Sequence, residues 1–141
     1  GRNDDLQSSP PPNLNYLDVG LAARHACGIV NNTGQNQSTL TSGQLTCWGY
    51  NGDGRGDLPA NIANRSDFVD VDCATDHCCA LSTMGDLECF GINVPADIPT
   101  ESGYTRLVYH DDGGCVLNAL GEPSCWGTNN TIQLRLIMGG N

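Results

Sequence analysis

Residues 77–91 read HCCALSTMGDLECFG, and this stretch decides the fold class of the chain. Two short apolar runs, each with a cysteine, flank a turn that contains Met84 and Gly85. The pattern is typical of a β-hairpin, in which a short Gly-containing turn joins two antiparallel strands. Residues 113–127, GGCVLNALGEPSCWG, repeat it, and so do HACGIV at 25–30 and GQLTCWG at 43–49. The sequence therefore predicts an all-β fold built from repeats.

A further strand is expected before each hairpin. The three segments read YLDVGL at 16–21, FVDVDC at 68–73 and YTRLVY at 104–109. Each begins with an aromatic residue, has an aliphatic residue at its fourth position, and lies at the same distance from the first hairpin cysteine. We therefore expect one domain over residues 16–130, with repeats at about 16–60, 68–98 and 104–130. The first repeat is longer because it carries a polar insertion near residues 31–41.

The chain has eight cysteines, and the repeat alignment gives their pairing. Cysteines at facing positions of antiparallel strands lie within the Cα separation that a disulfide requires. The alignment thus predicts the bridges Cys27–Cys47, Cys79–Cys89 and Cys115–Cys125, and leaves Cys73–Cys78 as a fourth bridge in the second repeat only. There is no Cys-x-x-Cys pair, and the three histidines do not lie at zinc-ligand spacing. We therefore expect neither a metal nor a cofactor.

Charge and composition restrict the class of partner. The formal net charge is −10, from 16 acidic and 6 basic residues, so a nucleic-acid partner is not expected. No apolar run approaches the roughly 20 residues that span a bilayer. The cysteine count together with four Asn-x-Ser/Thr acceptor sites predicts a secreted, extracellular glycoprotein. The expected N-linked glycan sites are Asn31, Asn36, Asn64 and Asn129.

The repeated motif resembles the regulator-of-chromosome-condensation repeat. The residues that carry the resemblance are HACGI with CWGYN at 47–51, HCCAL with CFGIN at 89–93, and CVL with CWGTN at 125–129. The paired cysteines make it most similar to the Crinkly-type variant of plant receptor-kinase ectodomains, over about residues 16–130. The resemblance implies that each repeat is a four-stranded propeller blade and that about seven blades close a ring. Three repeats imply an incomplete propeller.

The two ends of the chain are expected to lie outside the repeats. Residues 1–15 are polar and Pro-rich, which predicts an extended arm. Residues 131–141 predict a C-terminal strand, with one apolar face formed by Ile132, Leu134, Leu136 and Met138. An incomplete propeller exposes apolar faces and strand edges. We expect one or both termini to dock on another copy of the chain by strand addition, head to tail.

These features lead to two hypotheses for function. The first is a non-enzymatic secreted glycoprotein subunit that self-assembles head to tail into an extracellular structural polymer, a fibril. The alternative is a ligand- or protein-binding module of a larger propeller-type receptor ectodomain or inhibitor. No catalytic residues can be assigned. One weak adhesion motif, Arg55-Gly56-Asp57, resembles integrin-type ligands and would give the chain a cell-surface protein as partner.

Structural roles are expected for the remaining polar and aromatic positions. The aromatic residue after the second cysteine of each repeat is expected in the core between blades, at Trp48, Phe90 and Trp126. His25 and His77 stand at one motif position and are expected to make structural hydrogen bonds. The acidic clusters are expected on the surface, where they keep the chain soluble; they consist of Asp70, Asp72, Asp76, Asp111 and Asp112.

Overall fold

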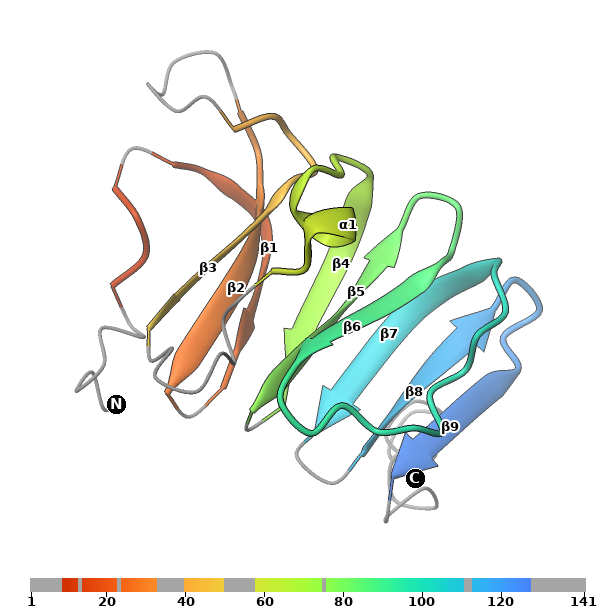
Figure 1. Cartoon of the computed structure of the whole chain (residues 1–141). Helices are drawn as coiled ribbons and strands as arrows, with labels where there is room; N and C mark the ends of the chain where they lie inside the picture. The colour runs from red at the N-terminus through yellow and green to blue at the C-terminus, as the bar shows by residue number, and fades with distance from the viewer. Residues whose placement is uncertain are drawn as a thin grey trace, which may run out of the picture.

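The structure, a computed structural model, describes residues 9–12, 14–22, 24–32, 40–49, 58–74, 76–110 and 113–127. Over these residues the chain forms three separate three-stranded antiparallel sheets (Figure 1). Sheet 1 contains β1 (Tyr16–Leu21), β2 (His25–Val30) and β3 (Leu45–Gly49). Sheet 2 contains β4 (Phe68–Cys73), β5 (His77–Ser82) and β6 (Leu87–Gly91). Sheet 3 contains β7 (Tyr104–His110), β8 (Gly113–Asn118) and β9 (Pro123–Gly127), and a short helix, α1 (Ala60–Ala63), connects sheet 1 to sheet 2.

The three sheets share one backbone plan. In each sheet the order of strands follows the sequence, and the second strand is the central one. The register of the first strand slips once in every sheet, between Tyr16 and Asp18, between Phe68 and Asp70, and between Tyr104 and Arg106. The slip recurs at the same repeat position, which indicates a β-bulge that bends and twists each first strand. The fold is therefore all-β and built from blade-like repeats, as the sequence predicts.

The hairpin turns follow from glycine at the fourth turn position. Gly85 and Gly121 both have φ of 82°, a conformation that a Cβ atom disfavours. The N–H of Gly85 donates to Ser82 O at 3.0 Å, and the N–H of Gly121 donates to Asn118 O at 2.9 Å. These bonds close the two tight turns at the places where the sequence predicts them.

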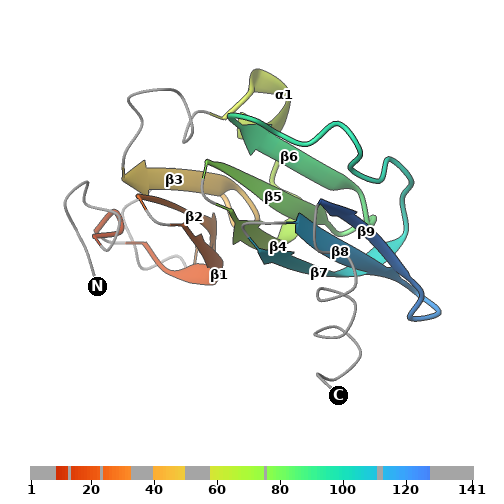
Figure 2. The same cartoon turned by 90° about the horizontal axis from the view of Figure 1, so that it is seen from below.

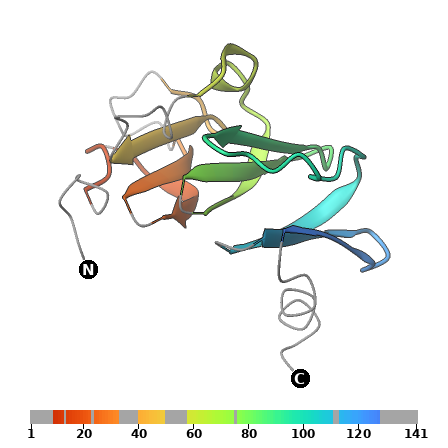
Figure 3. The same ribbon diagram turned by 60° about the horizontal axis from the view of Figure 1, so that its bottom comes forward.

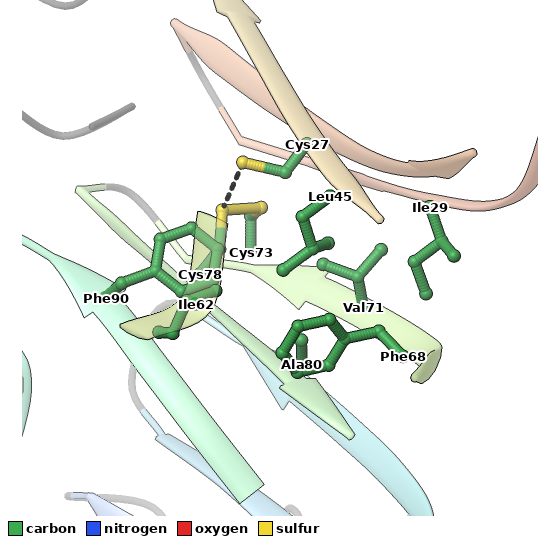
Figure 4. Close-up of a cluster of buried hydrophobic side chains, with 10 residues drawn as sticks. All are labelled: Cys27, Ile29, Leu45, Ile62, Phe68, Val71, Cys73, Cys78, Ala80 and Phe90. Atoms are coloured by element: carbon green, nitrogen blue, oxygen red, sulfur yellow. Dashed lines mark hydrogen bonds between the residues drawn. A yellow bond between two sulfur atoms is a disulfide. The ribbon is translucent and has the colours of Figure 1, made fainter. Parts of the chain in front are cut away.

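The sheets stack face to face with their first strands together. Strand β1 lies beside β4, and β4 lies beside β7. The third strands, β3, β6 and β9, lie along the opposite edge of their sheets from these first strands (Figures 2 and 3). One apolar cluster fills the junction between sheets 1 and 2, and another fills the junction between sheets 2 and 3. Ile62 of α1 packs into the first cluster (Figure 4). The described residues form an open stack of three blades with no closed barrel, which is an incomplete propeller.

Each repeat has three strands in the described residues, whereas the resemblance implies four. The difference is clearest after β6, where residues 92–103 are described and contain no strand. This segment includes Pro95 and Pro99, which have no N–H to donate to a strand ladder. In the part of the chain that the structure describes, no helix is long and apolar enough to cross a bilayer.

The four disulfides are Cys27–Cys47, Cys73–Cys78, Cys79–Cys89 and Cys115–Cys125, the same pairs that the repeat alignment gives. Three of them join the second strand of a sheet to its third strand, across directly facing positions. Cys73–Cys78 instead joins β4 to β5. No cysteine is left free.

The two terminal segments are described only in part. Residues 1–8 and 13 of the expected arm, and all of the expected strand at 131–141, lie outside the described residues. Of the arm, residues 9–12 and 14–15 contain no strand. Asn15 O accepts the N–H of Asn31 at 2.8 Å, which extends the pairing between β1 and β2 by one bond.

Candidate functional site

The stacked sheets meet through two equivalent faces. We call the face that a sheet turns to the preceding sheet its leading face, and the opposite one its trailing face. The leading faces of sheets 2 and 3 are built from matching positions: Phe68, Val71, Cys73, Cys78, Ala80 and Phe90 in sheet 2, and Tyr104, Leu107, Tyr109, Gly114, Val116 and Trp126 in sheet 3. They pack on trailing-face residues such as Ile29 and Leu45 of sheet 1, and Leu81 and Leu87 of sheet 2. Phe90 and Trp126 are thus core residues between blades, as expected.

Aspartates of one sheet bind the first strand of the next. The N–H of Val71 donates to Asp18 Oδ2 at 3.0 Å across the first junction. Across the second junction, Leu107 N–H donates to Asp70 Oδ2 at 3.3 Å and Tyr109 N–H donates to Asp72 Oδ2 at 3.2 Å. First strands have a free edge, and these carboxylates satisfy donors that the sheet itself leaves open.

The expected surface role of Asp70 and Asp72 is therefore wrong. Both side chains are half-buried at a junction, because the inner strands of neighbouring sheets approach closely there. Asp76, which is also half-buried, binds His77. Asp111 and Asp112 lie outside the described residues.

Asp18 and Asp70 form a carboxyl pair between sheets 1 and 2. Burial raises the pKa of Asp70 to about 7, and its hydrogen bond with Asp18 and the nearby Asp72 charge act in the same direction. The N–H of Leu107 opposes this shift because it stabilises the ionised form. Asp70 consequently holds its proton up to near-neutral pH, in a hydrogen bond with Asp18.

His77 joins sheet 2 to sheet 3. Its Nδ1 lies 2.9 Å from Asp76 Oδ1, and its Nε2 is hydrogen-bonded to the hydroxyl of Tyr109. Burial raises the pKa of Tyr109 to about 12, so this hydroxyl stays protonated and uncharged. His77 and Tyr109 are almost completely enclosed, with 5% and 6% exposed, whereas Asp76 is half-buried. Because the three side chains bind one another and join two sheets, we assign this chain of groups a structural role.

His25 occupies the position at the first junction that His77 occupies at the second, but it contacts a cysteine sulfur instead of a tyrosine hydroxyl. Its Nε2 lies 3.4 Å from Cys78 Sγ, and Cys78 Sγ lies 3.5 Å from Cys27 Sγ (Figure 4). Cys73 and Cys78 stand at the repeat positions of Tyr109 and Gly114, so the disulfide fills the space that the tyrosine ring fills at the second junction. His25, Cys73 and Cys78 have donor atoms within 4.8 Å of one another. With both sulfurs in a disulfide, they offer no thiolate to a metal.

The leading face of sheet 1 has no described sheet before it. Val19 is 38% exposed, whereas the matching Val71 is 3% and Leu107 is 6% exposed. Leu21 is 65% exposed, whereas Cys73 and Tyr109 are each 6% exposed. Tyr16 and Trp48 complete this face; their ring centroids lie 5.4 Å apart, and both side chains are half-buried. The sequence predicts Trp48 in a core between blades, as for Phe90 and Trp126. The structure instead leaves Trp48 half-buried, because no described sheet packs on the leading face of sheet 1.

No described sheet follows sheet 3 either, but the residues of its trailing face differ from those of sheets 1 and 2. Leu117 and Pro123 are half-buried there, at the positions of the buried Ile29 and Leu45 in sheet 1. Arg106 stands where sheets 1 and 2 have Asp18 and Asp70, and Gly113 replaces the histidine. This face therefore lacks the acceptor and the imidazole that serve the two junctions inside the chain.

Of the other sequence-predicted site residues, the structure describes only Asn31 and Asn64. Asn64 is exposed at the end of α1, and Asn31 is half-buried beside β2. Asn36, Asn129, the Arg55–Asp57 motif and the docking face of Ile132, Leu134, Leu136 and Met138 lie outside the described residues. Asp18 and the open face of sheet 1 were not predicted as functional. A usable signal was Asp at the third position of the first two repeats.

An open stack of disulfide-clamped blades defines the class of fold as an incomplete β-propeller, and known structures agree with it. No protein-family model and no curated protein sequence matches the chain. The ectodomain of the receptor kinase CR4 from Physcomitrella patens is 23% identical with a TM-score of 0.62, over 86% of this chain and 30% of that one. The CRINKLY WD40 ectodomain of the Arabidopsis thaliana receptor kinase ACR4 is 19% identical with a TM-score of 0.61, over 92% of this chain and 47% of that one.

A third similar structure comes from a different kind of protein. The C-terminal domain of gp131 from bacteriophage phiKZ is 17% identical with a TM-score of 0.59, over 86% of this chain and 38% of that domain. The chain thus spans less than half the length of each of these structures. At such identities the likeness shows a Crinkly-like fold.

Proposed function

We propose that the chain is a non-enzymatic interaction module of an extracellular protein, in which it supplies three consecutive blades of a larger propeller-type ectodomain. The open leading face of sheet 1 carries this proposal. Its apolar positions, Val19 and Leu21, are the ones that a preceding blade covers in sheets 2 and 3. A contiguous exposed apolar face with buried equivalents marks an interface.

Two further observations support this function. The similar plant structures are ectodomains of receptor kinases, and the chain spans 30% and 47% of them, as expected for part of a ring of blades. Four disulfides in 141 residues suit an oxidising, extracellular environment. On this proposal the module has binding partners and no substrate.

Self-assembly into a fibril is the second candidate, and the trailing face of sheet 3 favours it. Packing of that face on sheet 1 of another copy would be head to tail, which gives a ring or a filament. In this contact the N–H of Val19 would face Arg106, whereas the matching N–H groups inside the chain face an aspartate. Gly113 would stand where the junctions inside the chain have a histidine. Because this junction would lack both polar links found inside the chain, blades of a larger ectodomain are the preferred occupants.

The mass of the native, non-reduced chain distinguishes the two candidates. Light scattering over a dilution series is expected to give a monomer of 14.9 kDa plus any glycan. A mass that grows with concentration would contradict the first candidate and support assembly from copies. In that case Leu21→Asp should weaken association at least tenfold, because it places a charge in an apolar contact.

A matched pair of variants tests the open face itself. Leu120 is 85% exposed at the turn between β8 and β9, away from any junction, so Leu120→Asp is the control. If the face of sheet 1 is open, Leu21→Asp and Leu120→Asp each change the free energy of unfolding of the monomer by less than about 0.5 kcal/mol. A loss of several kcal/mol for Leu21→Asp alone would mean that this chain covers the face itself, and would contradict the proposal.

A further inference from the structure

Two disulfides of different sheets touch at the first junction. Cys78 Sγ, which is bonded to Cys73, lies 3.5 Å from Cys27 Sγ, which is bonded to Cys47 (Figure 4). The contact is as close as a sulfur nucleophile and its target come before they react. At the second junction Tyr109 and Gly114 occupy the place of Cys73 and Cys78, so only the first junction has this contact.

The four cysteines of these two disulfides differ in their exposure to solvent. Cys78 and Cys27 are fully buried, whereas Cys73 is 6% exposed. Cys47 is half-buried on the third strand of its sheet. Of the two residues in the Cys73–Cys78 bridge only Cys73 has any exposed surface, so a small thiol that opens the bridge attacks Cys73, and Cys78 leaves as a thiolate inside the junction. The nearest disulfide sulfur to that thiolate is Cys27.

We propose that Cys78 exchanges partners when a small thiol attacks Cys73, so that a bridge inside sheet 2 becomes a bridge between sheets 1 and 2. In the first step the thiol sulfur bonds to Cys73 Sγ, and the Cys73–Cys78 bond breaks. In the second step Cys78 Sγ bonds to Cys27 Sγ, the Cys27–Cys47 bond breaks, and the electron pair leaves on Cys47 Sγ. One thiol enters at Cys73 and one emerges at Cys47, so the exchange involves no net oxidation or reduction.

His25 is placed to carry the proton of this exchange. Its Nε2 lies 3.4 Å from Cys78 Sγ, so the imidazole can take the proton of the entering thiol or of a protonated Cys78. The thiolate released at Cys47, which is half-buried, takes up one proton at the end of the exchange, so the proton count balances. Because only a few per cent of an ordinary thiol is ionised at pH 7, a neighbouring base accelerates such a step.

The variant Cys73→Ser tests the exchange without any added thiol. It leaves Cys78 unpaired beside Cys27, and the expected product has a Cys27–Cys78 bridge and a free thiol at Cys47. Alkylation followed by mass spectrometry of non-reduced peptides identifies both. Recovery of an intact Cys27–Cys47 bridge with the alkyl group on Cys78 would overturn the proposal. Cys78→Ser is the control, and it should retain Cys27–Cys47 with the free thiol on Cys73.

The native chain gives an independent test, which decides the matter if Cys73→Ser does not fold. Reduced glutathione should produce a mixed disulfide on Cys73, a free Cys47 and a Cys27–Cys78 bridge. A free thiol at Cys78 would overturn the proposal, and so would a Cys73–Cys78 bridge that resists glutathione under conditions that open Cys79–Cys89.

The role of His25 has its own readout. We expect the substitution His25→Gln to slow the exchange about tenfold at pH 7. The exchange rate of this variant should rise with pH up to the ordinary thiol pKa of about 8.5, because only the thiolate reacts. The native rate should depend less on pH, because the imidazole supplies the base. Equal pH profiles for the two proteins would remove His25 from the exchange.

Discussion

Asp70 connects all three sheets of the stack through one side chain. It is hydrogen-bonded to Asp18 of sheet 1 and accepts the N–H of Leu107 from sheet 3 at 3.3 Å. An ionised Asp70 would face two further carboxylates, Asp18 and Asp72, at a half-buried position. The protonated form avoids this repulsion, and the junctions are therefore sensitive to pH.

Stability should decrease as the pH rises from about 4 to 7. Asp70 ionises near its ordinary pKa of 3.8 in the unfolded chain, whereas the folded chain holds the proton up to about pH 7. The folded state binds more protons in this window, so the free energy of unfolding falls with rising pH, by at most about 1.4 kcal/mol per pH unit. The contribution is fully present below pH 4 and lost above pH 7.

The substitution Asp70→Asn should flatten this dependence and raise the stability at pH 7, because the amide cannot ionise. Denaturant unfolding of both proteins at pH 4, 5.5 and 7 measures the effect. Glu101→Gln, at an exposed carboxylate before β7, is the control and should leave the slope unchanged. An unaltered slope in Asp70→Asn would show that the carboxyl pair is not the source of the pH dependence.

The sequence does not reveal this residue chemistry. Asp at the third position is visible in the first two repeats, but its partner lies in the next sheet, 53 positions away for Asp18 and 37 for Asp70. The stacking of sheets, and not the local pattern, brings these groups together. For the same reason the contact of His25 with Cys78 could not be read from the repeat alignment.

The elements themselves are more predictable. Facing cysteines on neighbouring strands and glycine at the fourth turn position are local features, so the hairpins and the disulfide pairs follow from repeat spacing. The third strand of each repeat was also visible, through the residues around Cys47, Cys89 and Cys125. A fourth strand was implied by resemblance alone, and Pro95 and Pro99 prevent regular pairing in the described segment after β6.

The disulfide clamps of sheets 1 and 2 permit a matched comparison. Cys27–Cys47 closes 20 residues and Cys79–Cys89 closes 10, at equivalent positions where Cys27 and Cys79 are both fully buried. Replacing both cysteines of either pair by Ala should cost about 3 kcal/mol. The longer loop should cost about 0.5 kcal/mol more, because loop-closure entropy grows slowly with length.

Denaturant unfolding under non-reducing conditions measures both double variants against the native chain. Packing losses at equivalent positions largely cancel, so the difference between the variants reports on loop length. A greater loss for the 10-residue loop would contradict the entropic explanation. It would indicate that the bridge of sheet 2 contributes mainly through the packing of the second junction.

On the scale of the whole molecule, the described residues form a stack of sheets whose two ends differ from its interior. Sheet 2 is covered on both faces, whereas sheet 1 exposes Val19 and Leu21, and sheet 3 leaves Leu117 and Pro123 half-buried. Repeat counting predicts that the ends are open. Only the structure shows which residues form the open face, because burial at one repeat position differs between sheets.

The accessibility of matching residues tests the central claim most directly. Hydroxyl-radical footprinting of the native monomer, read by mass spectrometry, should label Leu21 about as readily as the exposed Leu120. Tyr109, at the same repeat position as Leu21, should be protected despite the higher intrinsic reactivity of its ring. Protection of Leu21 equal to that of buried leucines such as Leu81 would contradict the open face, and with it the proposal that other blades pack there.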